Sequence, residues 1–435
     1  IMETVTIQVP PSSIGHIKGK YSSKINEIER RSKARCIIKK NNTVEVMGTN
    51  EARKIALNLI KDCVHNSIIV YSHPTEAIIA LQPPLIGLKT VLFSKYDGIV
   101  DRNNVNKAYF ILDKGEEMNE EDKLSSLFEN LNLEKINNII APEKDRISVE
   151  HITKRLIELT AKPANKYLDF KVRVNIGKQL FYPAFREVLN LPESIPLSKL
   201  LKYEIGYKKD AKTTFMNHIS SEIARIIENR LIELKYQKNA EITQRASIHL
   251  IDNKAQKRFI VSTNITSEGK LIPRKFKFEN NRLLFFAFVG PKSALDFRFK
   301  VLSQEPSITN LPTELYNSVK NAIYNPDKKT VTLNDTSNYL FTITRVKIKS
   351  IFVKCKNEFS NGKIKVSISE VHEDGQKDVQ VTMTSEALQK VIEKMSQTNK
   401  IEEELKLECY KEIEKFVNEV KNIVNELQYN TNGYN

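Results

Sequence analysis

Apolar and polar residues alternate most regularly in the first 65 residues of the chain. Apolar side chains at positions 5, 7 and 9 predict a half-buried strand, which ends at Pro10-Pro11. The pair Asn41-Asn42 tolerates the positive φ of a tight hairpin, and a one-sided apolar stripe from Ala52 to Val64 predicts a helix. The expected elements are a strand over 5–9, helices over 13–17 and 22–33, strands over 35–40 and 43–47, and a helix from Asn50.

Residues 67–165 hold short apolar stretches followed by an acidic one. Pro83-Pro84 marks a turn between two of the expected strands. The segment from Glu116 to Lys144 is rich in Asn, Ser and Glu, which predicts a linker or an exposed loop. The short strands are expected over 67–71, 76–81, 88–93 and 107–112.

The segment 166–384 predicts a second and larger globular unit. Its first strand, 170–176, alternates apolar residues with Lys171, Arg173 and Asn175, so one wet and basic side is expected. An amphipathic helix is expected near 215–234. Consecutive strands with short turns then indicate an antiparallel sheet covered by helices. These strands are expected over 246–251, 258–263, 274–278, 283–289, 295–301, 339–356, 363–368 and 379–384.

The last segment, 385–427, is expected to be helical throughout and to pack across the sheet. A coiled coil is the alternative, although the heptad pattern is not sustained over three repeats. The fold class is therefore α+β. The expected regions are a small β-α-α-β-β-α domain over 1–66, a short-strand region with an acidic linker and helix over 67–165, an antiparallel-sheet domain over 166–384, and C-terminal helices over 385–435.

Charge is concentrated at the start of the chain. The 435 residues include 68 Lys and Arg against 53 Asp and Glu, a net charge of +15. Residues 1–65 hold 12 basic and 6 acidic residues, which is +6, and the other 370 residues share +9. This excess favours an anionic partner, such as a nucleic acid or an acidic protein surface.

The cysteines, and the absence of several motifs, limit the chemistry. Four widely spaced cysteines without a C-x-x-C pattern are expected to be reduced thiols, not a disulfide scaffold or a zinc site. No cofactor is expected, since no phosphate loop, G-x-S-x-G elbow or H-E-x-x-H motif is present. No membrane-spanning apolar run and no secretory signal are found. A leading Ile suggests a fragment, so the sequence leaves open whether a targeting segment precedes it.

The order β-α-α-β-β-α, with a basic glycine-containing turn between the first two helices, resembles the type I KH domain. The matching residues are Val9-Pro10, the run from Gly15 to Ser22, and then Ile25 and Ile28. The resemblance implies that four single-stranded nucleotides bind beside a GxxG turn, where the backbone closely approaches the phosphates. Ser22 replaces the last glycine of that motif, and Lys18 stands where the family usually has an apolar residue.

Carried over by position, the resemblance implies a set of RNA-binding residues. The clamp is Gly19-Lys20-Tyr21-Ser22. The groove and its basic rim are Ile17, Ile25, Ile38, Lys18, Lys24, Arg35, Lys39 and Lys40. Ser22 offers its amide and hydroxyl at a helix N-cap, but a positive φ there would cost about 1 kcal/mol.

Three strands of the larger unit suggest a second basic surface. Lys275 and Lys277, Arg298 and Lys300, and Arg345, Lys347 and Lys349 each alternate with apolar residues. If these strands are neighbours, one face of the sheet is a basic platform that could hold RNA, with Arg345, Lys347 and Lys349 as its candidate residues. The alternative is that the alternation marks only one buried face.

One enzyme class deserves a test, because some KH domains are fused to two-histidine phosphoesterases. Two H-x-T/S motifs are present, His151-Ile152-Thr153 and His218-Ile219-Ser220. Both histidines fall in helical patterns, whereas this chemistry requires them to face one pocket from strands. The sequence therefore predicts a non-enzymatic protein, with the phosphoesterase as a remote alternative.

The expected function is binding of single-stranded RNA, either mRNA or rRNA, in a ribonucleoprotein with a role in post-transcriptional regulation. Other RNA-binding or ribosome-associated proteins are expected partners. The competing hypothesis is a protein-interaction scaffold whose degenerate KH domain binds protein. The acidic stretch could also be a tail that competes with RNA. As a whole the chain resembles a poorly characterised fungal KH family of the vigilin-associated type, which implies a cytoplasmic location. A fungal mitochondrial Sls-type KH protein is the alternative.

Overall fold

The computed structural model describes residues 3–67, 76–85, 87–98, 108–121, 124, 144–162, 169–183, 190–197, 200, 211–239, 243–278, 282–304, 313–357, 364–373, 375–425 and 427. The predicted strand over 67–71 and most of the acidic stretch fall outside these residues. Ser67 itself is the last residue of a helix.

The N-terminal domain has the predicted β-α-α-β-β-α order. Its antiparallel sheet has the strand order β1-β3-β2, and its buried apolar residues form one core with the helices. Asn42 in the β2–β3 turn has the positive φ expected there, 59°. The elements are β1 (Glu3–Gln8), α1 (Ser13–Lys18), the short 3-10 helix η1 (Lys20–Ser22), α2 (Ser23–Ser32), β2 (Arg35–Ile38), β3 (Thr43–Gly48) and α3 (Asn50–Ser67).

The rest of the described chain is built on one large, mainly antiparallel sheet. Its main path runs β13-β12-β11-β18-β19-β20-β7-β15-β14-β4, and only the β4–β14 pair is parallel. The strands on this path are β4 (Glu76–Leu81), β7 (Asp169–Pro183), β11 (Thr243–Asp252), β12 (Arg258–Ile265), β13 (Leu271–Phe278), β14 (Arg282–Val289), β15 (Asp296–Gln304), β18 (Phe341–Lys356), β19 (Ile364–Glu373) and β20 (Gln376–Ser385). The predicted α+β class is confirmed.

Short strands extend the sheet where β7 continues beyond Gly177. Here β7 changes its partner from β20 to β9, and a Cβ at position 177 would overlap the carbonyl oxygen of Met216. Glycine is therefore required where β9 approaches. The extending strands are β5 (Thr90–Tyr96), β6 (Tyr109–Lys114), β8 (Ser194–Pro196) and β9 (Ala211–Met216), while a further short strand, β10 (Gln237–Asn239), pairs with the end of β18.

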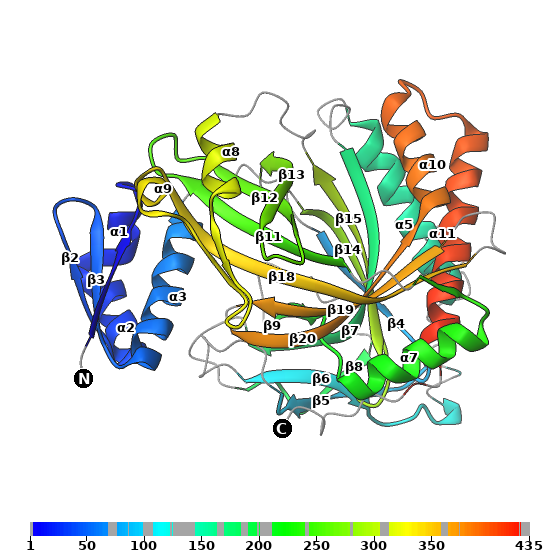
Figure 1. Cartoon of the computed structure of the whole chain (residues 1–435). Helices are drawn as coiled ribbons and strands as arrows, with labels where there is room; N and C mark the ends of the chain where they lie inside the picture. The colour runs from blue at the N-terminus through cyan, green and yellow to red at the C-terminus, as the bar shows by residue number, and fades with distance from the viewer. Residues whose placement is uncertain are drawn as a thin grey trace.

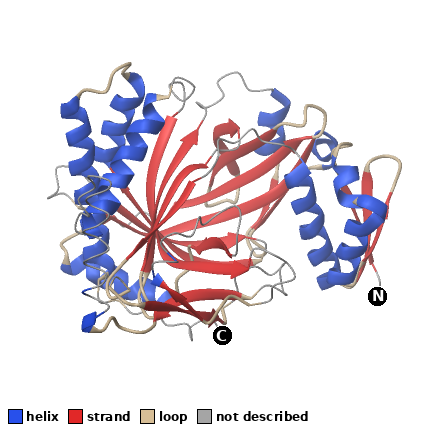
Figure 2. Ribbon diagram, turned by 180° about the vertical axis from the view of Figure 1, so that it is seen from behind, coloured by secondary structure: helices blue, strands red, loops and turns tan. Residues whose placement is uncertain are grey.

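Helices cover one face of the sheet. The largest core joins β7, β15, β19 and β20 to four helices, three of which gather at the end opposite the N-terminal domain (Figures 1 and 2). These four are α5 (Lys144–Ala161), α7 (Ser221–Glu233), α10 (Glu386–Gln397) and α11 (Glu403–Val424). A second core packs α8 (Thr313–Lys320) and the hairpin β16 (Ile323–Asn325)–β17 (Thr330–Thr332) on β11, β12, β13 and β18, beside α9 (Asp335–Leu340).

Two helical predictions need correction. The helix expected from Phe215 starts only at Ser221, because Phe215 lies in β9 and Ser220 caps the helix by accepting a hydrogen bond from the Ile223 amide. The C-terminal segment is two helices, and residues 398–402 separate them. The expected packing of this segment across the sheet is confirmed by the core that α10 and α11 share with the strands.

The uncovered face of the large sheet is concave and basic. Lys171 on β7 lies close enough to Lys277 on β13 for their charges to interact, although five strands separate β7 from β13 along the sheet. The sheet therefore curves until these two strands face each other. The side expected to be wet, with Lys171, Arg173 and Asn175, lies inside this curve, and Asn175 is only 3% exposed.

The N-terminal domain is joined to the large sheet through α3 and the end of β1. Ile251 of β11 belongs to the core of the small domain. Thr342 of β18 donates a hydrogen bond to the Gln8 carbonyl at 3.1 Å, and Arg258 of β12 contacts the ring of His65. Figure 1 shows α3 on the side of the small domain nearest the sheet, with β2 on the far side.

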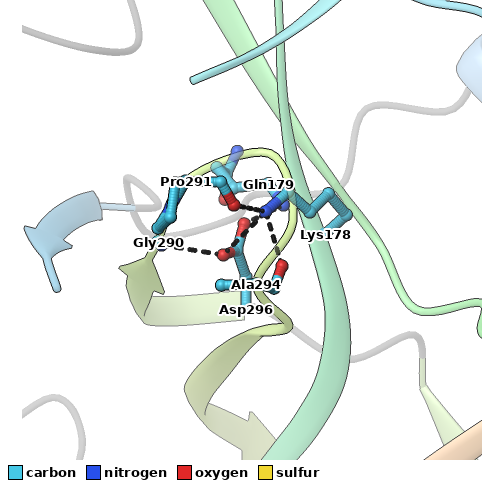
Figure 3. Close-up of polar contacts among 6 residues, drawn as sticks. All are labelled: Lys178, Gln179, Gly290, Pro291, Ala294 and Asp296. Carbon is cyan, nitrogen blue, oxygen red and sulfur yellow. Dashed lines mark hydrogen bonds and ion pairs between the residues drawn. The ribbon is translucent and has the colours of Figure 1, made fainter. Parts of the chain in front are cut away.

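A fully buried ion pair fixes the β14–β15 turn on β7 (Figure 3). The Lys178 ammonium donates to the carbonyls of Pro291 and Ala294 and lies 3.2 Å from Asp296. The second carboxylate oxygen of Asp296 accepts from the Gln179 amide, and the first also accepts from the Gly290 amide. Both charges are thus neutralised and fully hydrogen bonded, which a buried pair requires.

Candidate nucleic-acid interface

The turn between α1 and α2 has a conformation that requires glycine at its first position. Gly19 has φ 71°, and a Cβ there would lie 2.7 Å from both the amide nitrogen and the Cβ of Lys24. Any other side chain would therefore be strained and would collide with the first turn of α2.

The two residues that end the turn are strained non-glycine residues. Tyr21 has φ 53° and Ser22 has φ 63°, so both are left-handed. The positive φ considered for Ser22 from the sequence is therefore present. The Ser22 hydroxyl makes no capping hydrogen bond to α2. Strained backbone of this kind tends to cluster at binding sites.

The turn presents basic and aromatic side chains to solvent. Lys18 and Lys20 are exposed, and Tyr21 is 90% exposed. The Lys20 ammonium lies 5.4 Å from the centre of the Tyr21 ring. An exposed ring beside two cations suits a base and its phosphate, because bases stack on aromatic side chains while phosphates attract lysine.

Some of the predicted rim residues form ion pairs. Lys24 lies 3.0 Å from Glu27, and Lys39 lies 3.1 Å from Glu45. Arg35 and Lys40 are both exposed.

The predicted apolar groove is only partly at the surface. Ile17 is fully buried and Ile25 is 9% exposed, so both belong to the core of the domain. Ile38 is half-buried on the edge strand β2 and is the most exposed of these three predicted groove residues.

The sequence pattern of the KH domain matches residues 4–62. Residues 4–62 form a KH domain. Its helices, turn and hairpin are the elements described above, and β2 lies on the side of the domain away from the large sheet (Figure 1). The larger region has no family assigned to it.

Other comparisons give weak likenesses. No curated protein matches the chain in sequence. The solved RNA triphosphatase Pct1 of S. pombe is 11% identical, with a TM-score of 0.41 over 67% of this chain and 96% of that one. The same enzyme in complex with the Spt5 CTD gives 10% and 0.40, covering 67% and 97%. A putative adenylate cyclase of Bacillus halodurans gives 9% and 0.19, covering 43% and 90%. We draw no function from likenesses at this level.

The predicted platform residues of β18 lie on the concave face, although the three basic strands are not neighbours. Arg345, Lys347 and Lys349 are opposite His249, Ser247 and Arg245 of β11. Along the path, two strands separate β13 from β18, and three more separate β18 from β15. Curvature, not adjacent pairing, brings basic side chains of β13 and β18 near those of β7.

The concave face is crowded with like charges. Burial, together with Lys277, Arg173 and Lys275, lowers the pKa of Lys171 to about 8. Burial also lowers the pKa of Lys349 to about 8, and the charges of Arg173, Lys347 and Arg245 act in the same direction. We call Lys171, Arg173, Lys275, Lys277 and Lys349 the concave cluster. Of the acids in this region, Glu373 pairs with Lys347 at 3.0 Å, and the charge of Asp169 raises the pKa of Lys277 against the effect of burial.

The second predicted basic strand is partly used for packing. The Arg298 guanidinium lies 4.8 Å from the centre of the Phe215 ring and 4.6 Å from that of Phe285. Phe297 and Phe299, on the opposite side of β15, are fully buried in the core. The sequence missed Lys171 and Arg173 as members of the cluster because alternation does not show whether a polar side faces bulk water or a concave interior.

The two H-x-T/S motifs have no shared pocket among the described contacts. His151 is exposed on α5, whereas His218 lies 3.4 Å from Asp378 ahead of α7. Burial lowers the pKa of His218, while Asp378 raises it. The expected helical position is correct for His151 only.

The other chemical groups behave as ordinary structural residues. All four cysteines are free and buried, and burial raises the pKa of Cys36 to about 11 and that of Cys409 to about 12. Within the described ranges, no three His, Cys, Asp or Glu side chains are grouped to hold a metal ion. No helix there is long and apolar enough to cross a membrane.

Proposed function

We propose that this protein binds single-stranded RNA without catalysing a reaction, and that the KH turn is its primary contact. The observation that carries the proposal is the open turn from Lys18 to Ser22. It combines a glycine that no other residue can replace, two exposed lysines and an exposed Tyr21 ring. The contacts with the large sheet come from α3 and the end of β1, whereas the side chains of the turn are exposed, so the contact surface is accessible.

The concave cluster supplies a second contact in this proposal. Its lysines are held among like charges, which is unfavourable unless an anion is bound between them. RNA phosphates provide such charges at regular spacing. Arg345, Lys347 and Lys349 serve here as the sequence-based proposal expects, with Lys171 and Arg173 added from β7.

Binding of a short single-stranded RNA tests the primary contact. The variant Lys18→Glu with Lys20→Glu reverses two charges at the turn and leaves Gly19 in place. We expect at least a tenfold loss of affinity, because one base-stacking or phosphate contact is worth about 1–3 kcal/mol. Lys254→Glu with Lys270→Glu is the matched control, since both lysines are exposed on turns of the large sheet. Equal affinities for the two variants would contradict the proposal.

The scaffold hypothesis gives a different result in the same assay. If the KH domain binds a protein and not RNA, neither variant changes an already negligible RNA affinity. If the protein does bind RNA through the turn, the turn variant binds RNA more weakly and the control variant does not.

The wider assignment is part of this proposal. We take the protein to be a cytoplasmic KH protein related to the fungal vigilin-associated family, which acts on mRNA or rRNA with other RNA-binding proteins. The mitochondrial Sls-type family is the alternative. Imaging of the tagged full-length protein distinguishes them, since a mitochondrial signal contradicts the cytoplasmic proposal.

A further inference from the structure

A large cleft separates the KH domain from the edge of the large sheet. Its volume is about 1620 Å³, which exceeds the roughly 300–1,000 Å³ of pockets that enclose small molecules. One wall is formed by β1, α3 and the β2–β3 turn of the KH domain. The other wall is formed by β17, the turn before it, α9 and β18. A cleft of this size suits a segment of a polymer.

The charge of the cleft is strongly positive. Among the described residues, eight lysines and arginines line it, against one carboxylate, that of Glu45. Glu45 already pairs with Lys39, Arg53 pairs with Glu3 at 2.5 Å, and Arg345 lies 3.6 Å from Asp62. The remaining excess therefore attracts a polyanion.

Two of these cations line the cleft from opposite walls, and neither forms an ion pair with a carboxylate of the described residues. Lys54 belongs to α3 and lies beside Gly375, and Lys328 belongs to the β16–β17 turn. Both side chains are exposed. The ring of Tyr339, which is 72% exposed, also lines the cleft. Cations along a groove with an aromatic side chain are the usual means of holding a single strand.

The cleft connects the two basic regions already described. Lys39 and Lys40 belong both to the rim of the KH groove and to the cleft lining. At the other end, Arg345 lines the cleft, and Lys347 and Lys349 follow on the same face of β18 at two-residue steps.

We propose that the cleft between the KH domain and the large sheet binds a single-stranded RNA segment that continues from the KH turn toward the concave face. This inference rests on the proposed RNA-binding function. The inference adds that the chain contacts a strand longer than the four nucleotides that a KH domain binds. It also assigns a role to the docking of α3, which forms one wall of the cleft.

The test compares two RNA lengths and three variants of the full chain. The cleft variant is Lys54→Glu with Lys328→Glu, the turn variant is Lys18→Glu with Lys20→Glu, and the control is Lys254→Glu with Lys270→Glu. All three carry the same change in charge. The probes are single-stranded RNAs of four and of about 12 nucleotides, the latter within the site sizes known for single-strand binders.

We expect the cleft variant to bind the longer RNA at least tenfold more weakly and the four-nucleotide RNA as the control does. The turn variant weakens both. If the cleft variant binds the longer RNA as tightly as the control, the cleft proposal is wrong, although the KH proposal stands. If the turn variant has no effect on either RNA, the proposed function itself fails. Loss of binding to an acidic polyglutamate peptide, with RNA binding intact, would instead assign the cleft to a protein partner.

Discussion

The KH turn and the concave cluster carry the same kind of charge in opposite surroundings. Lys18 and Lys20 extend into solvent beside an exposed ring, whereas Lys171 and Lys349 are held among other cations inside a curved sheet. The charges of the exposed pair lower the stability of the folded protein very little. The enclosed pair is electrostatically unfavourable in the free protein, so a bound anion would relieve it. Position in the fold, not the number of charges, determines how each region responds to a ligand.

Lys178 gives an internal reference for this comparison. The Lys178 side chain is more deeply buried than any lysine side chain of the concave cluster. Its ammonium nevertheless forms an ion pair with Asp296 and donates hydrogen bonds to two carbonyls. Burial lowers the pKa of Lys178 and raises that of Asp296, while each partner's charge opposes the shift of the other. This buried cation has a structural role, whereas Lys171 and Lys349 of the concave cluster lie among other cations.

The largest expected effect therefore concerns Asp296. Replacement by Asn keeps the shape but leaves Lys178 as an uncompensated buried charge, which costs about 3–5 kcal/mol. Chemical denaturation of the full chain measures this loss of stability. The double variant Asp296→Asn with Lys178→Met should recover part of it, and failure to recover would show that the loss arises from packing alone.

The next largest effect is expected for the exposed ring of Tyr21 in the KH turn. Tyr21→Ala removes the exposed ring and keeps both lysines, so RNA affinity should fall by about 1–3 kcal/mol, the value of one stacked base. Fluorescence anisotropy with a short labelled RNA measures it, with Tyr316→Ala on α8 as the control for loss of a surface tyrosine. An unchanged affinity would leave charge as the only contribution of the turn.

The concave cluster has a signature in its dependence on pH. The unfolded lysines have a pKa of about 10.4, so between about pH 8 and pH 10.4 the unfolded chain binds more protons at Lys171 and Lys349 than the folded chain does. Their contribution to stability therefore rises with pH across that window. A bound anion favours the charged lysines, so RNA binding near pH 8–9 should take up protons.

Titration calorimetry in buffers with different heats of ionisation measures this uptake. The variant Lys171→Met with Lys349→Met should lose the proton uptake and melt at a higher temperature than the wild-type protein at pH 7. A variant that melts lower, with the same proton uptake, would mean that the cluster is structural.

The smallest effect concerns strain in the turn. Ser22→Gly relieves a left-handed backbone conformation and should stabilise the KH domain by up to about 1 kcal/mol. Hydrogen exchange of the α1 and α2 amides in the full chain measures it. Faster exchange in the variant would mean that the serine side chain contributes more than the strain costs.

The small domain could be predicted closely from the sequence, because each of its elements is determined by residues that are close together in the chain. Pro10-Pro11, the Gly19 turn, Asn41-Asn42 and the stripe on α3 each determine one element or one boundary. The strands of the large sheet were also located by alternation, within a few residues.

The concave cluster and the cleft depend on relations that no local pattern contains. Lys171 reaches Lys277 only because the sheet curves across several strands, and Lys54 faces Lys328 only because α3 docks on the sheet. The helix start at Phe215 failed for a related reason. Its apolar spacing fits a helix, but pairing with β7 makes it a strand.

The central claim is that the KH turn contacts RNA phosphates, and the salt dependence of RNA binding tests it most directly. The logarithm of the affinity is measured against the logarithm of the salt concentration for the wild-type chain and for Lys18→Glu with Lys20→Glu. Each phosphate contact on a single strand contributes about −0.7 to this slope, so losing two contacts should make it shallower by about 1.4. Parallel slopes for the two proteins would contradict the claim.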